Sequence, residues 1–161
     1  MRKLHFIGLV MLVVLAGVGL FLGSGIAAMI KLSLEQLAVE ADTIVLGTVT
    51  GQASAWNAQR TAIYTDVTVA VEEAIKGSPG AEVTFRIAGG IVGDIGMRTS
   101  NDPVFQDGEQ VIVFLNTEGA PASVVGLKQG KYTVRNGTVT RDGQTVAVAD
   151  FLNAIRAALK K

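Results

Sequence analysis

The sequence contains no cysteine and only one histidine, and these two absences exclude several kinds of chemistry. Without cysteine the chain can form no disulfide, no thiol nucleophile and no Cys-ligated metal site. His5 lies in the apolar N-terminal segment, so the rest of the chain has no histidine for a Ser-His-Asp triad, a His-ligated zinc or general base catalysis. A domain of this length buries enough surface to fold without disulfides.

A net charge of either sign is also lacking. The 14 basic and 14 acidic side chains balance over the whole chain, and without Arg2 and Lys3 the remainder has a slight acidic excess. Proteins that bind nucleic acids normally carry a basic face. We therefore expect no nucleic-acid partner.

The N-terminal segment has the composition of an export signal. Arg2 and Lys3 precede an almost unbroken apolar run over residues 6–23, and small residues follow up to Ala28. This pattern predicts a signal peptide over residues 1–28, cleaved after Ala27 or Ala28. The run is also close to the length of a membrane span, so an uncleaved hydrophobic helix that anchors the protein is the alternative. Both interpretations place the domain, residues 32–161, outside the cytoplasm, either secreted or anchored to the outer face of the cytoplasmic membrane.

Residues 63–77 predict a long, curved β-strand. Ile63, Thr65, Val67 and the next two odd-numbered residues share one face, while the more polar even-numbered residues share the other, which is the period-two pattern of a half-buried strand. The strand is expected to end before the turn at residues 76–80, which contains glycine and proline.

The remaining pattern predicts short strands between two helices. Ser33 and Gln36 form a capping box at the start of a short helix, and Asp150 is the expected N-cap of a C-terminal helix. Further strands are expected over residues 43–50 (with a bulge at Gly47), 82–87, 110–116 (buried on both faces), 123–127, 131–135 and 138–141. Asn136-Gly137 predicts a hairpin turn. Residues 51–60 are expected to form a polar loop, and residues 88–106 are the least regular part.

Many short strands without an alternating βαβ pattern favour a small barrel or sandwich. Three segments, in order, resemble the core of netrin-like, or TIMP-like, OB-fold domains: residues 41–49, the strand from Tyr64 that ends at Lys76-Gly77, and Asp107-Gly108-Glu109 before an apolar strand. These segments, together with the glycine-rich residues 89–98, also resemble an exported prokaryotic domain that can occur beside matrixin-type metalloproteases.

The resemblance implies a mainly β fold, a small closed OB-like barrel of five to six strands with a short N-terminal helix and a C-terminal helix. It also implies a binding module more than an enzyme. Inhibitory TIMP-like domains approach the zinc of a protease with an N-terminal cysteine, and this chain has none. Inhibition by that mechanism therefore does not carry over.

Four residues are the candidate contacts with a partner. Trp56 lies in the predicted polar loop and Tyr64 follows it, and both residue types are enriched at interfaces. Met97 and Arg98 adjoin the glycine-rich residues 89–96. That run lacks the Lys-Ser/Thr end of a phosphate-binding loop, so we expect its glycines to allow a tight or close backbone path. A tryptophan that caps one end of the barrel is the alternative interpretation of Trp56.

Four carboxylates, Asp94, Asp102, Asp107 and Glu109, lie in or near the irregular region and are weak candidates for a calcium site. Their spacing does not match an EF-hand, and such residues are common in turns. No other cofactor is indicated.

The leading hypothesis is an exported, non-enzymatic binding module that presents residues 54–60 and 89–105 to an extracytoplasmic protein or a surface polymer. One alternative is an accessory or inhibitory module for an extracellular metalloprotease, which rests on the resemblance alone. The other is a carboxylate-dependent hydrolase that uses Asp94, Asp102 or Glu109. An enzyme of this kind requires that these carboxylates converge in a cleft. In a binding module they would be dispersed on turns.

Overall fold

The computed structural model describes residues 30–160. The chain divides into two units, residues 1–30 and residues 31–161, and all the helices and strands named below belong to the second unit. The predicted signal peptide or anchor, with its hydrophobic helix, lies outside the described residues. Neither α-helix between residues 30 and 160 has the length and apolar character needed to cross a membrane.

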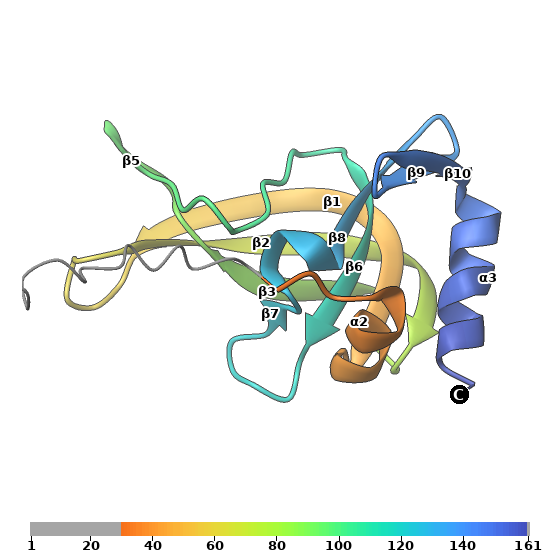
Figure 1. Ribbon diagram of the computed structural model, residues 1–161. Helices are drawn as coiled ribbons and strands as arrows, with labels where there is room; N and C mark the ends of the chain where they lie inside the picture. Colours follow the sequence, from red (N-terminus) through yellow and green to blue (C-terminus); the bar gives the residue numbers. More distant parts are fainter. Residues whose placement is uncertain (1–29, 161) are drawn as a thin grey trace, which may run out of the picture. The chain divides into compact units, whose positions relative to one another are not determined.

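The two longest strands, β1 (Thr43–Trp56) and β2 (Ile63–Lys76), form an antiparallel hairpin (Figure 1). In β2 the residues at positions 63, 65, 67 and 69 are buried and their neighbours are not, so the predicted alternation is confirmed. The register of the pair shifts next to Gly47, where a Cβ would lie 2.2 Å from the carbonyl oxygen of Ala70. The predicted bulge is therefore present, and it requires glycine because the two backbones approach so closely.

The expected loop over residues 51–60 is wrong in its first half. β1 continues to Trp56, which pairs with Ile63, and the connection is confined to residues 57–62. Asn57 holds this turn, because its side-chain oxygen accepts from the backbone N–H of Thr61 at 2.8 Å. Residues 51–56 have a weak preference for strands, but they pair with β2 along its length, and this pairing outweighs the weak preference.

Five strands are hydrogen-bonded in a ring. β2 pairs with β3 (Glu82–Ala88), β3 with β7 (Ser123–Val124), β7 with β6 (Gln110–Asn116), and β6 returns to β1. The chain is therefore mainly β, as expected. β7 is shorter than the predicted strand over residues 123–127, because Gly126 adopts a left-handed conformation and the 3-10 helix η1 (Leu127–Gly130) follows.

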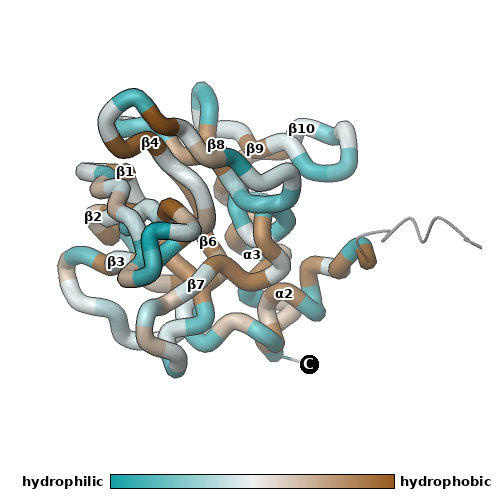
Figure 2. Tube along the Cα trace, turned by 90° about the vertical axis from the view of Figure 1, so that its left-hand side faces the viewer, coloured by the Kyte–Doolittle hydropathy of each residue, from teal (hydrophilic) through white to brown (hydrophobic). Residues whose placement is uncertain are grey.

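β6 is buried on both faces, as predicted, because it separates two hydrophobic cores. Val111, Val113 and Leu115 face the interior of the ring, where they join Val67, Phe85 and other residues of a first core. Ile112 and Phe114 belong to a second core on the outer side. Figure 2 shows β6 as a hydrophobic segment in the middle of the fold.

The second core is covered by two helices and a three-stranded extension of the sheet. The helices are α2 (Leu34–Glu40) and α3 (Val148–Ala158), and the strands are β8 (Lys131–Arg135), β9 (Thr138–Arg141) and β10 (Gln144–Ala147). The capping box of Ser33 and Gln36 and the turn at Asn136-Gly137 are both confirmed. Asp150 is not the N-cap of α3. The helix begins earlier, with Ala147 at the cap, because β10 leads directly into it.

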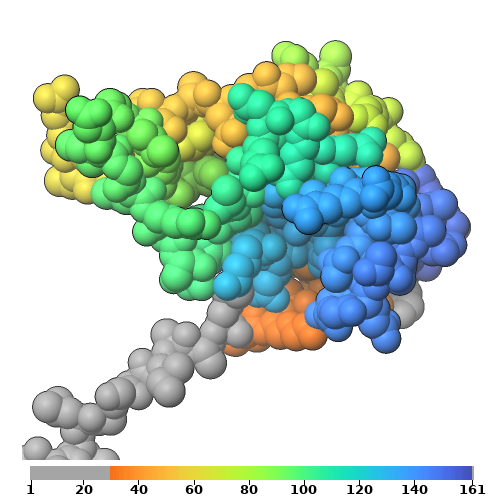
Figure 3. Space-filling model, turned by 90° about the horizontal axis from the view of Figure 1, so that it is seen from above, coloured from red at the N-terminus to blue at the C-terminus, as the bar shows by residue number. Residues whose placement is uncertain are grey.

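The irregular residues 88–106 contain a separate small hairpin, β4 (Gly90–Val92) with β5 (Ile95–Met97). It contacts the end of the β1–β2 hairpin (Figure 3). Ile91 and Ile95 are 72% and 55% exposed, so this hairpin presents apolar side chains to the solvent.

Candidate functional site

A chain of hydroxyl groups attaches the glycine-rich segment to the β1–β2 hairpin. The buried Thr65 hydroxyl donates to the carbonyl oxygen of Gly89 at 2.7 Å, and it lies 2.8 Å from the Ser54 hydroxyl. Because the single proton of Thr65 is used by Gly89, Ser54 must donate to Thr65. A Cβ on Gly90 would lie 2.3 Å from the Thr65 oxygen and 2.4 Å from that of Ser54. The expected close approach at the glycines is therefore present.

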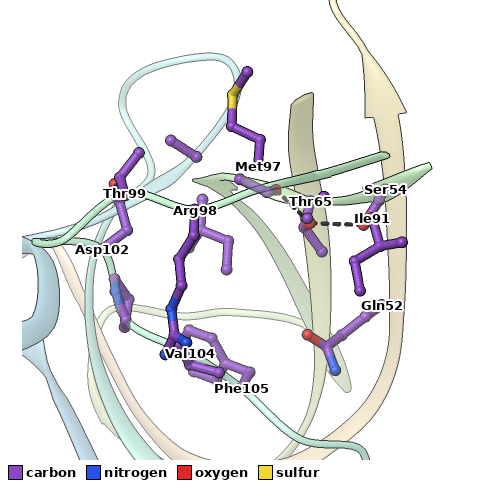
Figure 4. A pocket seen from close by; sticks show the side chains of 16 residues that line it. Gln52, Ser54, Thr65, Ile91, Met97, Arg98, Thr99, Asp102, Val104 and Phe105 are labelled. Carbon is purple, nitrogen blue, oxygen red and sulfur yellow. Dashed lines mark hydrogen bonds between the residues drawn. The ribbon is translucent and has the colours of Figure 1, made fainter. Parts of the chain in front are cut away.

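This attachment leaves a pocket of about 530 Å³ between the hairpin and residues 98–105 (Figure 4). Its polar lining comes from Gln52, Ser54 and Thr65 on one side and from Thr99 and Asp102 on the other. Its apolar lining comes mainly from Ile87, Ile91, Pro103, Val104 and Phe105. A mixed lining and a volume of this size are typical of sites for small molecules or for part of a larger partner.

Arg98 is the only cationic side chain that lines this pocket. Figure 4 shows its side chain extended across the pocket toward Val104 and Phe105. Within residues 30–160 it has neither an ion-pair partner nor a hydrogen-bond partner, and it is exposed to solvent. An arginine that points into a pocket without a partner is available to bind an anion.

The other three predicted contact residues are placed differently. Met97 points away from Arg98, and its sulfur accepts from the backbone N–H of Ile63 at 3.5 Å (Figure 4). Trp56 is half-buried and lies two strand positions beyond Ser54, on the same face of β1, so it lies beyond the end of the pocket. Tyr64 is 37% exposed and points to the opposite face of β2 from Thr65. The structure therefore brings Arg98 and Met97 to the pocket. It places Trp56 beyond the end of the pocket and Tyr64 on the opposite face of β2.

A partly buried ion pair fixes the wall of the pocket formed by Val104 and Phe105. The Lys131 ammonium lies 2.7 Å from a carboxylate oxygen of Glu109, and the two side chains are only 10% and 12% exposed. The ammonium also donates to the carbonyl oxygen of Val104 at 2.5 Å and lies 4.5 Å from the centre of the Phe105 ring. Phe105 itself is buried in the first core.

Glu109 is stabilised as a carboxylate. Its partial burial alone would raise its pKa, but hydrogen bonds from Lys131, Thr133 and the backbone N–H of Gln106, with the charge of Lys131, together lower the pKa below its ordinary value. The side chain is therefore fully engaged within the fold.

The other candidate carboxylates are dispersed. Asp94 lies in the exposed turn between β4 and β5, Asp102 accepts from the Thr99 hydroxyl, and Asp107 accepts from the side-chain amide of Gln52 at 3.0 Å. Among residues 30–160, no three side chains of Asp, Glu, His or Cys lie close enough together to hold a metal ion.

Sequence reasoning missed Gln52 and Thr65 as lining residues, whereas Ser54 belongs to the predicted contact segment 54–60. The alternation of β2 placed Thr65 on the buried face among valines and isoleucine, and a hydroxyl on such a face signals a polar partner nearby. Gln52 was missed because β1 was expected to end before it.

No protein-family model matches the chain, and no curated protein matches it.

Proposed function

We propose that this protein is an exported, non-enzymatic binding module that holds an extracytoplasmic protein or a surface polymer at the pocket formed by β1, β2 and residues 89–105. The observation that carries this proposal is the pocket itself, which combines an apolar wall with an unpaired arginine. Arginine and exposed apolar groups around a concave site are typical of recognition surfaces.

The arrangement of the strands supports an OB-like barrel. The three segments that resemble netrin-like domains lie at the start of β1, in β2 and at the start of β6, and these strands are neighbours in the ring. OB folds bind their ligands along one sheet face and the adjoining loops. The pocket also lies against one face of the β1–β2 hairpin and is bordered by a loop segment.

The dispersal of the carboxylates also supports a binding module over a carboxylate-dependent hydrolase. Acid and base groups of a hydrolase must reach the same substrate bond. Asp94, Asp102 and Glu109 lie in a turn, beside Thr99 and in an ion pair, respectively.

Site-specific photo-cross-linking in exporting cells tests the proposed surface. A photo-reactive amino acid would replace Ile91, beside the pocket, or Val39, on α2, in the full-length chain. The two positions are matched, because both side chains are apolar and 72% exposed. We expect a discrete adduct with one partner from position 91 only. Adducts of equal yield from both positions, or from neither, would contradict the proposed surface.

The partner found in this way also tests the contact residues. A Trp56→Ala/Arg98→Ala double variant should remain folded and lose most of its affinity for that partner, because both residues lie on the pocket side of the hairpin. A Tyr64→Ala variant is the matched control, since Tyr64 lies on the opposite face. Full affinity in the double variant would rule out this surface. Identification of an extracellular metalloprotease as the partner would favour the accessory-module interpretation.

Export is tested separately. Protease added to intact producing cells should cleave or release residues 31–161, and the mass of the mature N-terminus distinguishes a cleaved signal peptide from a retained anchor. Full protection of the domain inside intact cells would contradict an extracytoplasmic location.

A further inference from the structure

Among the described arginines, Arg60, Arg98 and Arg135 form no ion pair with a carboxylate, and of these three only Arg98 lines the pocket. Arg86, Arg141 and Arg156 each pair with a carboxylate, Asp66, Asp142 and Glu73, respectively. Arg98 has no such partner among the described residues, although the carboxylate of Asp102 lines the same pocket. Asp102 is instead bonded to the Thr99 hydroxyl. The pocket therefore contains one guanidinium group and one carboxylate, and the two are not paired with each other.

The surface around the guanidinium group is apolar. Val104, which the extended Arg98 side chain approaches in Figure 4, is 53% exposed, and Ile91 across the pocket is 72% exposed. Phe105 and Ile87 lie deeper and are almost fully buried. A ligand that covered Val104 and Ile91 would remove apolar surface from water while it reached Arg98.

We propose that the pocket binds a carboxylate joined to an apolar group, with the carboxylate on Arg98 and the apolar group on Val104 and Ile91. This inference rests on the proposed function, because it names the chemical group that the partner presents at the same site. A guanidinium group binds a carboxylate through two parallel N–H···O bonds.

The presence of Asp102 in the pocket indicates how many negative charges the ligand group carries. A carboxylate carries one negative charge, which Arg98 alone balances, whereas a phosphate monoester carries nearly two. The second charge would face Asp102 in the same pocket without a further cation. The pocket therefore favours a singly charged anion, such as the chain end of a polypeptide or a free aliphatic acid.

Titrations of the ¹⁵N-labelled protein, as the cell exports it, test the inference by NMR. The probes are N-acetyl-phenylalanyl-leucine, its C-terminal amide and octanoate. We expect the peptide acid to shift the amide signals of residues 98, 99 and 54 and to bind about tenfold more tightly than the amide, because a charge-assisted hydrogen bond is lost in the amide. Arg98→Gln should abolish this preference. Arg135→Gln, which changes an exposed arginine in the β8–β9 hairpin, should retain it.

Equal affinity for the acid and the amide, an unchanged preference in Arg98→Gln, or no saturable binding of either peptide below ~10 mM would overturn the inference. If one of these results is found together with a specific adduct from position 91, the proposed binding function is still supported and only the inference about the carboxylate is refuted. Octanoate distinguishes the two sources of the group. An affinity equal to that of the peptide acid indicates a free acid, and a clearly weaker one indicates a polypeptide chain end; both results support the inference.

Discussion

The close contacts of two residues, Gly90 and Lys131, determine the geometry of the pocket. Gly90 lies against two hydroxyl oxygens and has a φ of 138°, a conformation that residues with a side chain rarely adopt. Lys131 connects β8 to the wall of the pocket through Glu109, Val104 and Phe105. In both cases the pocket depends on a residue that a ligand in it would not need to touch.

Gly90→Ala should lower the free energy of unfolding by about 2–4 kcal/mol, because the new methyl group meets the oxygens of Ser54 and Thr65 in addition to the strain of a positive φ. Gly93→Ala is the matched control. Gly93 also has a positive φ, 59°, but a Cβ there meets no atom within 4 Å, so we expect a loss of only about 1 kcal/mol. Urea unfolding measures both, and equal losses would contradict a steric origin of the difference.

Glu109→Gln should reduce the dependence of stability on acid pH. The pKa of Glu109 is lowered in the folded protein, so its contribution to stability is fully present above its ordinary pKa of 4.5 and is lost as the pH falls through the folded value. Unfolding free energies measured by urea between about pH 3 and pH 6 should fall less steeply for the variant than for the parent protein. Glu118→Gln, which removes an exposed carboxylate, is the control. Identical slopes for all three proteins would refute the coupling.

Lys131→Met should cost about 2–4 kcal/mol of stability, because it leaves a partly buried carboxylate without its cation. It should also alter the NMR signals of Val104 and Phe105, both of which the ammonium contacts directly. A variant of full stability with unchanged signals at these two residues would show that the ion pair does not hold the wall.

At the scale of elements, strands whose own residues show a burial pattern could be predicted, and strands that depend on a distant partner could not. β2 and β6 carry their burial patterns in their own residues. The outer half of β1 contains Gly51, Gln52 and Ser54, residues without strand preference, and it is a strand because β2 is long enough to pair with it. The sequence indicated residues 54–60 and 89–105 as the contact surface. It did not indicate the part of the pocket that Gln52 and Thr65 supply, because the pocket is assembled from segments that are far apart in the sequence.

Helix α3 begins without a side-chain cap, and this gives a stabilising prediction. Its N-cap residue, Ala147, is exposed and makes no side-chain hydrogen bond. Ala147→Ser should raise the free energy of unfolding by about 0.5–1 kcal/mol, because a serine oxygen can accept from the first turn. Ala157→Ser, at an exposed position near the other end of the helix, should lower it by a few tenths of a kcal/mol, ~0.5 at most. Thermal unfolding measures both, and a destabilised Ala147→Ser variant would contradict the expected capping effect.

At the scale of the molecule, β6 belongs to both hydrophobic cores, so the ring and its helical cover share a strand. Neither core keeps its packing if β6 leaves the sheet. We therefore expect residues 31–161 to unfold in one cooperative transition.

Phe85→Ala in the ring core and Ile155→Ala in the outer core should each lower the free energy of unfolding by about 2–5 kcal/mol. Each variant should shift the midpoint of Trp56 fluorescence and the midpoint of far-UV circular dichroism by the same amount, since both cores melt together. Separate midpoints for the two signals in either variant would show that the cores unfold independently.

Residues 88–104, which form the outer side of the pocket, contribute no member to either hydrophobic core. Their sequence can therefore change with little effect on folding, apart from the glycines at the attachment point. Such a segment is free to diversify during evolution while the ring stays constant. A library randomised at positions 91, 98 and 104 would then yield folded proteins with new ligand preferences, much as loops vary on an immunoglobulin scaffold.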